Sequence, residues 1–380
     1  KVCLARLIRG QVHAHESIHG ASHPDDSEKM GGLFFPVGGK KRVAIEEAAA
    51  GNIVAFSKVE KVGIGETFTA TGEDLVQIAS PPIPVPMVAL AIQPKSRADE
   101  QKIGEALHKL EAEDPTFRIE HDPETHELIA HGMSDLHLQV VEAMLKRRFN
   151  VEIEKHLPKI AFRETVTKAA EGHHRHKKQS GGKGQFGECY IRLKPLAEGE
   201  GFIFKDAVVG GSIPRNLIPA VEKGIQEQIE KGVLVHSKVV DVEVELYDGK
   251  FHAVDSDEAS FKAAGARAFR EGFAKAGPVL LEPTVELEIH VPTSDAGTIF
   301  SDITSQRRGH VLDQWTESDG AITVIKAEAP MSTVQTYNRD LKSQTSGEGF
   351  YVQEQKGYSR MPAAEQKRVL AEATLDHGDD

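Results

Sequence analysis

Cysteine is almost absent from this sequence, with only Cys3 and Cys189 in 380 residues. Two thiols so far apart form no disulfide framework and are typical of a protein in a reducing compartment. No apolar run approaches the roughly 18 residues that a membrane span needs. The first residues, KVCLARLIRG, resemble the interior of a strand and lack a signal-peptide layout, so we expect the segment to begin inside a longer protein. We therefore expect a cytoplasmic location and no membrane partner.

Nucleotide-binding and catalytic motifs are also missing. The chain has no GxxxxGK[ST] sequence, which supplies the backbone cradle for nucleotide phosphates, so we predict no cofactor site in this fragment. Serine, histidine and aspartate are plentiful, but no spacing matches a nucleophile elbow or a triad. We assign no catalytic residue.

Two histidine-rich runs raise the alternative of a metal site. They contain His13, His15, His19 and His23 in one case, and His173, His174 and His176 in the other. His13 and His15 share a face if they lie on a strand. Neither run has the cysteines and compact spacing of structural zinc sites, so we predict no metal at either.

Charge is unevenly distributed along the chain. The formal net charge is −12, yet residues 173–187 read HHRHKKQSGGKGQFG and contain no acidic side chain. Its glycines allow close approach of the backbone to a partner, and its charge suggests a polyanion such as nucleic acid. A solvated surface loop is the simpler interpretation of the same composition, and composition alone does not decide between them.

The pattern of elements indicates several domains of mixed α+β class. Residues 1–80 show short strands separated by glycine turns, as in a small β-barrel or sandwich, and the proline-rich stretch 80–86 predicts a linker. From residue 87 to 157 the order is β-α-β-β-α-β, a split ferredoxin-like unit, with Ser134 as a helix N-cap. The same order recurs in 284–353, and the tail beyond 360 predicts a short amphipathic helix.

Between these two units lies a middle block. It is predicted to contain strands at 189–193, 202–204 and 238–246, a helix at 215–231, and a second helix capped by Ser256. Trp315 and the phenylalanines are expected in the core.

Several long motifs resemble bacterial elongation factor G, the translational GTPase. They are LIAHGMSDLHL (128–138), QSGGKGQFG (179–187), VVGGSIPRNLIPAVEKGIQE (208–227), VVDVEVELYDGKFHAVDSDEASFKAAG (239–265), PVLLEP (278–283) and the Arg307, Arg308, Gly309 turn. The resemblance covers essentially the whole chain and is densest over 125–310. Several ordered motifs in one order make it far more specific than any single glycine motif.

The resemblance implies a domain layout. It is a β-barrel at 1–82 (domain II-like, N-terminally incomplete), ferredoxin-like split βαβ domains at 83–157 and 283–360, an elongated domain at 158–282 with a split βαβ topology like that of ribosomal protein S5, and a tail at 361–380. The family's GTPase domain precedes domain II, so GTP and magnesium are expected on that domain and not here.

The resemblance also implies that three loops of the fourth domain, at 180–185, 211–215 and 249–256, form a tip that reaches the decoding region of the small ribosomal subunit. We call them the tip loops. The residues predicted to bind RNA or the ribosome are Ser180, Gly181, Gly182, Lys183, Gln185, Gly211, Ser212, Arg215, His252 and Asp255. Lysines would contact phosphates and His252 would hydrogen-bond or stack, whereas a structural role for Asp255 is favoured. Lys177 and Lys178 precede the matched motif, and a solvated loop stays open for them.

The implied partners are the ribosome, through rRNA of the decoding region and of the large-subunit GTPase-associated region, with tRNA and mRNA, and the chain is expected to be a monomer. The implied activity is tRNA–mRNA translocation. Ala253 follows His252 where the family commonly has an acidic residue, and residues 11–35 match weakly. Such departures also fit a paralogue that protects or recycles ribosomes. A non-ribosomal RNA- or ligand-binding protein is a further alternative, although the aromatic RNP pattern of RNA-binding sheets is missing.

Overall fold

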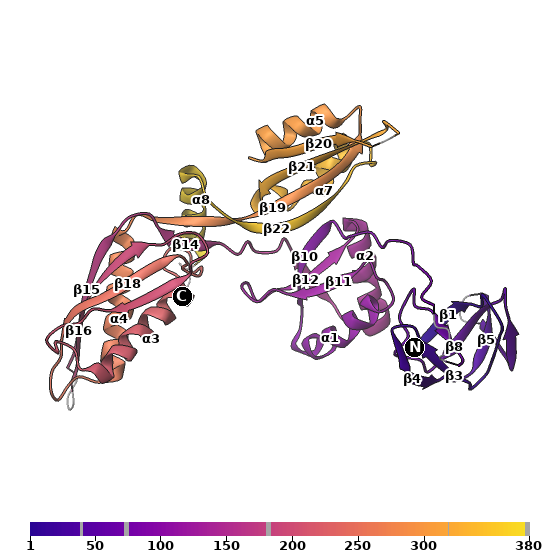
Figure 1. Ribbon diagram of the computed structural model, residues 1–380, viewed down its shortest axis with the longest axis horizontal. Helices are drawn as coiled ribbons and strands as arrows, with labels where there is room; N and C mark the ends of the chain where they lie inside the picture. Colours follow the sequence, from indigo (N-terminus) through magenta and orange to yellow (C-terminus); the bar gives the residue numbers. More distant parts are fainter. Residues whose placement is uncertain (39–40, 72–75, 180–183, 318, 377–380) are drawn as a thin grey trace. The chain divides into compact units, whose positions relative to one another are not determined.

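A computed structural model describes residues 1–38, 41–71, 76–179, 184–317 and 319–376 (Figure 1). It is a mixed α+β, multidomain fold, as predicted. The chain divides into two compact units. The first consists of Lys1–Pro86, Ile92–Glu120 and Leu128–Lys155, and the second of Met87–Ala91, His121–Glu127 and His156–Asp380. In the part of the chain that the structure describes, no helix combines the length and apolarity of a membrane span.

The described part of the N-terminal segment of the first unit folds into strands joined by turns. Its largest sheet has the order β1-β8-β5-β6. A two-stranded sheet pairs β2 with β7, and a three-stranded sheet has the order β4-β3-β9. The strands are β1 (Val2–Arg6), β2 (Gln11–His13), β3 (Ser17–Gly20), β4 (His23–Lys29), β5 (Leu33–Gly38), β6 (Lys41–Ile45), β7 (Glu47–Ala49), β8 (Ile53–Ser57) and β9 (Phe68–Thr69). Ile18, Leu33 and Phe56 are each 1% exposed and form the centre of its core. The strand predicted at the first residues is β1.

The next module follows the predicted order β-α-β-β-α-β. It comprises β10 (Val88–Pro94), α1 (Arg97–Glu111), β11 (Arg118–His121), β12 (Leu128–Gly132), α2 (Asp135–Met144) with the π-helical turn η1 (Leu145–Phe149), and β13 (Ile153–His156). Its sheet has the strand order β11-β12-β10-β13. The Ser134 side chain caps α2 by accepting from the His137 N–H, which confirms the predicted cap. Ile103, Leu107 and Leu110 form the buried face of α1, because they recur at helical spacing.

The middle module, which we call the tip module, has two helices against one face of a four-stranded sheet (Figure 1). The sheet order is β15-β16-β18-β17, with β17 parallel to β18. The elements are β14 (Arg163–Val166), β15 (Ala170–Lys178), β16 (Gln185–Pro195), β17 (Phe202–Asp206), η2 (Arg215–Leu217), α3 (Ile218–Lys231), β18 (Val242–Lys250) and α4 (Glu258–Lys275). The helices approach so closely that a Cβ on Gly224 would lie 2.1 Å from the Lys262 carbonyl oxygen, so glycine is required there.

Three predictions for the tip module are wrong in detail. The strand expected at 238–246 runs from Val242 to Lys250, because Asp241 adopts φ +56° and interrupts the chain just before it. The α4 cap is Asp257, whose carboxylate accepts from the Ser260 N–H at 2.8 Å, whereas the predicted cap, Ser256, donates from its hydroxyl to the Phe186 carbonyl oxygen of β16. The basic run does not begin as a loop, since residues 173–178 belong to β15 and pair with β16 in continuous register.

The C-terminal module is organised on the long strand β19 (Pro278–Pro292). Its first residues pair with β14 of the tip module, which is why it begins before the predicted 284, and its remainder pairs with β21 and β22. The other elements are α5 (Ala296–Ser301), η3 (Asp302–Gln306), β20 (His310–Thr316), β21 (Ile322–Pro330), α6 (Met331–Val334), α7 (Tyr337–Gln344), β22 (Phe350–Arg360) and α8 (Ala363–Asp376). The helix α8 confirms the predicted C-terminal helix. Trp315 is 41% exposed, so its predicted place in the core is wrong.

Candidate nucleic-acid interface

The first and third tip loops are hydrogen-bonded to each other at one end of the sheet. The Gly184 N–H donates to the Asp255 carboxylate at 3.0 Å, and the Phe186 N–H donates to the Asp255 carbonyl oxygen at 2.8 Å. The Ser256 hydroxyl donates to the Phe186 carbonyl oxygen, also at 2.8 Å. The predicted bracing role of Asp255 is therefore what the structure shows.

The second tip loop reaches the third through an apolar contact. The side chain of Ile213 is 1% exposed, and a Cβ on Gly249 would lie 2.5 Å from its Cδ1 atom. Gly211 has φ +72°, a conformation that side chains disfavour. Gly184 and Gln185 of the first loop thus lie with the second and third loops at one end of the tip module.

The two predicted polar residues of the second loop differ in exposure. Arg215 is exposed at the first position of η2. The hydroxyl of Ser212 is buried and, within the described ranges, has no hydrogen-bond partner.

His252 is exposed, and its ring is positioned by hydrogen bonds within its own loop. Its side chain is 56% exposed, and Nδ1 lies 3.2 Å from the Asp255 N–H and 3.4 Å from the Val254 N–H. In the neutral ring Nδ1 therefore accepts, and the proton sits on Nε2, where it can be donated outward. In the protonated ring the same Nδ1 lies 3.3 Å from the Asp255 carboxylate. The ring is thus held by its own loop in either state and offers a donor to a phosphate or a base edge.

The remaining predicted residues divide into those that the structure describes and those that it does not. Gln185 begins β16, and its side-chain oxygen lies 3.0 Å from His176 Nε2. Lys177 and Lys178 are exposed at the end of β15. Ser180, Gly181, Gly182 and Lys183 lie outside the described residues, and their binding role stays a prediction.

The sheet face opposite the helices carries aromatic and basic residues that sequence reasoning missed. The His173 ring stacks on Tyr190 with centroids 4.2 Å apart, Arg175 lies 5.3 Å from the Phe186 ring centroid, and Arg192 lies 5.0 Å from that of Tyr247. The sequence feature that could have indicated this face is the alternation of His173, Arg175 and Lys177. These three side chains point to one face once residues 170–178 are assigned to a strand. Arginine–aromatic pairs of this kind can stack on bases.

Glu188 anchors the His173 side of this face. Burial favours protonation of its carboxyl, but hydrogen bonds from His173 and Tyr190 outweigh burial and lower the pKa of Glu188 below its ordinary value. The carboxylate therefore stays ionised near neutral pH and fixes the His173 ring at 2.9 Å. His173 and Tyr190 are thus positioned by a carboxylate of the same face.

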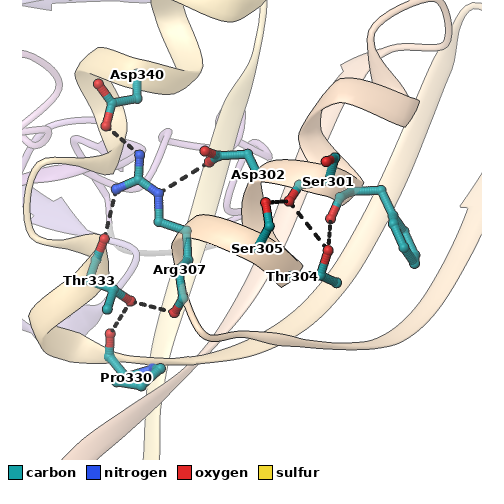
Figure 2. Close-up of polar contacts among 9 residues, drawn as sticks. Ser301, Asp302, Thr304, Ser305, Arg307, Pro330, Thr333 and Asp340 are labelled. Carbon is teal, nitrogen blue, oxygen red and sulfur yellow. Dashed lines mark hydrogen bonds and ion pairs between the residues drawn. The ribbon is translucent and has the colours of Figure 1, made fainter. Parts of the chain in front are cut away.

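The second basic motif of the sequence, the arginine turn (Arg307, Arg308 and Gly309), is neutralised internally. Figure 2 shows Arg307 donating to Asp302 at 3.1 Å, to the Thr333 carbonyl oxygen at 2.7 Å and to Asp340. Arg308 makes a two-pronged pair with Glu282 at 2.7 and 2.9 Å, which raises the pKa of the Arg308 guanidinium. These guanidinium groups hold the module together and are poor candidates for contacts with RNA.

The histidine runs do not converge. His13 lies 3.6 Å from the Glu47 carboxylate, while His19 Nδ1 lies 2.9 Å from the Pro24 carbonyl oxygen. Over the described part of the chain, no three histidine, cysteine, aspartate or glutamate side chains are grouped as a metal site. Both cysteines are free thiols.

Three family models match the chain in order. They are "Elongation Factor G, domain III" at residues 83–156, "Elongation factor G, domain IV" at 158–277 and "Elongation factor G C-terminus" at 279–369. A curated relative described as an elongation factor G-like protein of Thermotoga maritima is 40% identical over 372 residues, which cover 98% of this chain and 54% of the relative. A crystal structure of a Thermus thermophilus protein matches with a TM-score of 0.77 and 35% identity, over 98% of this chain and 55% of that one. The chain therefore spans about half the length of the relatives it matches.

Proposed function

This chain belongs to the elongation factor G family, and on that premise we propose that it is the ribosome-binding part of a translation factor that moves tRNA and mRNA. The matched domains support a translation elongation factor-like role in general. The tip loops carry the more specific proposal, because they place exposed donors together at one end of the domain IV region. The proposed partner of that end is RNA of the small-subunit decoding region, together with tRNA and mRNA.

The observation that supports this most directly is the bracing of the tip. The Asp255 carboxylate and carbonyl, the Ser256 hydroxyl and the packing of Ile213 tie the second and third loops to each other and to Gly184 and the start of β16. Preorganised loops lose less conformational freedom when they bind. A solvated loop without a function would have no need of three independent ties to its neighbours.

The chemistry proposed for the tip is binding and not catalysis. Arg215, Lys177 and Lys178 would neutralise phosphates, which positions RNA without reading its sequence. His252 would donate from Nε2 to a phosphate or a base edge, and the Arg175 and Phe186 pair behind it would stack. Nothing in this set requires a bond to be broken.

Further properties of the whole protein belong to the same proposal. We place GTP and magnesium on the part of the relatives that this chain does not cover, and we propose a cytoplasmic monomer that also contacts the GTPase-associated region of the large subunit. The finer topologies implied by the resemblance are part of the proposal as well: a β-barrel at the N-terminus, ferredoxin-like domains III and V, and a domain IV like ribosomal protein S5.

Co-sedimentation with 70S ribosomes tests the proposal. At low salt the chain should pellet with ribosomes, and Lys183→Ala combined with His252→Ala should weaken pelleting about tenfold or more, as expected when two contacts with charged RNA groups are lost. The thermal unfolding midpoint should not change. A matched control is Lys223→Ala with Lys231→Ala, which removes exposed charge from α3 of the same module.

Absence of ribosome binding at low salt would overturn the proposal. Equal weakening by both variant pairs would show that binding depends only on general charge. A lower unfolding midpoint in the tip variant would assign the loops a structural role instead.

A further inference from the structure

The C-terminal module carries a row of side chains across the face of its sheet that the helices leave uncovered. In β19, Val285, Leu287, Ile289 and Val291 are fully buried in the helix-side core, so the alternate residues point the other way. The register then aligns four residues on that opposite face. Trp315 of β20 pairs with Val324 of β21, Val324 with His290 of β19, and His290 with Phe350 of β22. We call these four residues the cross-strand row; Figure 1 labels their strands.

The cross-strand row is aromatic and accessible at its two ends, Trp315 and Phe350. His290 and Phe350 stack with centroids 4.6 Å apart and planes 7° from parallel. Trp315 and Phe350 are 41% and 44% exposed, whereas Val324 between Trp315 and His290 is 1% exposed. Exposed tryptophan is costly in water and is enriched where proteins bind partners. None of the four residues belongs to the tip module.

The charge beside the row is negative. His290 Nε2 lies 2.9 Å from Glu288, and Nδ1 lies 3.7 Å from Glu317. Those carboxylates are about half exposed, at 48% and 46%. Lys326 and Lys356 form ion pairs with other glutamates than Glu288 and Glu317. Lys326 pairs with Glu286 at 3.0 Å, and Lys356 pairs with Glu354 at 2.8 Å.

We propose that the cross-strand row and the carboxylates of Glu288 and Glu317 form a docking site for an arginine- or lysine-bearing segment of a protein partner. A guanidinium placed over the Trp315 ring gains a cation–π interaction, and arginine also stacks flat on aromatic faces. The two carboxylates complete the match by supplying the opposite charge. This site goes beyond the RNA-binding function proposed for the tip.

The same charges disfavour nucleic acid on this face. A four-stranded sheet with exposed aromatics can stack bases, but such sheets rely on nearby cations to hold the phosphates. Here the nearest charged side chains are acidic, and the lysines are already paired with Glu286 and Glu354. Phosphates would meet like charge at the row, whereas a basic peptide would not.

Trp315 is the only tryptophan in 380 residues, so its fluorescence reports occupancy of the row directly. The experiment is a titration of the chain with a capped hexa-arginine peptide at about 50 mM salt, where screening is modest. A saturable change in Trp315 fluorescence is expected. Capped hexaglutamate and a ten-nucleotide uridine RNA should leave the fluorescence unchanged.

A matched pair of variants separates the site from the general acidity of the chain. Glu288→Gln with Glu317→Gln should weaken hexa-arginine binding about fivefold, the effect of losing two exposed ion pairs. Glu328→Gln with Glu354→Gln removes the same charge at the level of Glu286, about 13 Å along the strands from His290 at roughly 3.3 Å per residue, and should weaken binding less than about twofold. Phe350→Ala should weaken it about threefold through lost stacking.

Three outcomes would overturn the proposal. Absence of a saturable fluorescence change with hexa-arginine would show that the row does not bind a cation. Equal weakening by the two glutamine pairs would reduce the interaction to diffuse charge. Tighter saturation by the uridine RNA than by hexa-arginine would make the face a base-stacking surface.

Discussion

The tip loops and the arginine turn both place basic side chains next to glycine. The basic side chains of the turn are paired with carboxylates of their own module, whereas those of the tip are exposed. At the turn, the side chains of Arg307 and Arg308 are 11% and 31% exposed and point at carboxylates of their own module. At the tip, the His252 side chain is 56% exposed, and Arg215 lies on the surface of η2. Two of the acidic partners of the turn, Glu282 and Asp340, lie 26 and 33 positions away in the sequence, so a basic motif alone does not identify a nucleic-acid contact.

Burial of the acidic partner explains the difference physically. The Glu282 side chain is 1% exposed and Asp302 is 10% exposed, so each carboxylate needs a cation within the fold. The Asp255 carboxylate at the tip instead accepts from the Gly184 N–H, and it meets the His252 ring at Nδ1, 3.3 Å away, which leaves Nε2 of that ring available to a partner. Substitutions at the turn should therefore lower the stability of the module, whereas substitutions at the tip should mainly weaken binding.

Replacement of Arg307 by alanine should have the largest effect. It leaves Asp302 with an uncompensated charge in a partly buried site and removes the stacking of the guanidinium on Tyr337, 4.9 Å away. The expected loss is about 4 kcal/mol of unfolding free energy. Urea unfolding followed by the fluorescence of Trp315, which lies in the same module, measures it. A loss below about 1 kcal/mol would mean that the turn is not structural.

Replacement of Arg308 by alanine should cost slightly less, about 3 kcal/mol, because Ser332 still donates to Glu282 at 3.0 Å. Arg308 also adopts φ +53°, a conformation that glycine adopts without strain. Arg308→Gly should therefore be about 1 kcal/mol more stable than Arg308→Ala. The same Trp315 assay compares the two variants, and the reverse order would show that backbone strain at Arg308 is negligible.

Much of the fold could be predicted from the sequence because periodicity and caps are local signals. The β-α-β-β-α-β order of 87–157, the Ser134 cap and the C-terminal helix follow from residues close together in the chain. The exposed position of Trp315 could not be predicted, since it depends on which face of the sheet the helices cover. The length of β19 depends on β14, more than 100 positions earlier.

In the candidate site, too, local motifs could be predicted and features that depend on long-range pairing could not. Motif resemblance indicated the three loops, and a structural role for Asp255, bracing its loop or capping a helix, was favoured; in the structure its carboxylate accepts from the Gly184 N–H. The stacked His173 and Tyr190 pair was missed, because residues 173–178 look like a polar loop until their pairing with β16 is known. Long-range pairing of this kind is not encoded in the local pattern.

Removal of the Asp255 carboxylate should have an intermediate effect that is confined to the tip. Asp255→Ala deletes the acceptor for the Gly184 N–H and should cost about 1 kcal/mol. Asp255→Asn keeps an acceptor oxygen and should cost less than half as much. Hydrogen exchange measured on a peptide covering 179–186 should rise in the alanine variant and change little in the asparagine variant. Equal exchange in both variants would mean that the negative charge, and not the hydrogen bond, holds the loops.

Neutralisation of Lys177 and Lys178 should have the smallest effect on stability and a clear effect on binding. Both side chains are exposed at the end of β15, so Lys177→Ala with Lys178→Ala should change the unfolding free energy by less than about 0.5 kcal/mol. If each lysine neutralises one phosphate, the slope of log binding constant against log salt should become shallower by about 1.5 to 2. Ribosome co-sedimentation at several salt concentrations gives this slope, with Lys223→Ala and Lys231→Ala as the control of equal charge. An unchanged slope would assign both lysines to the solvated surface and confine the interface to the loops beyond them, because an exposed cation that releases no counterion contacts no phosphate.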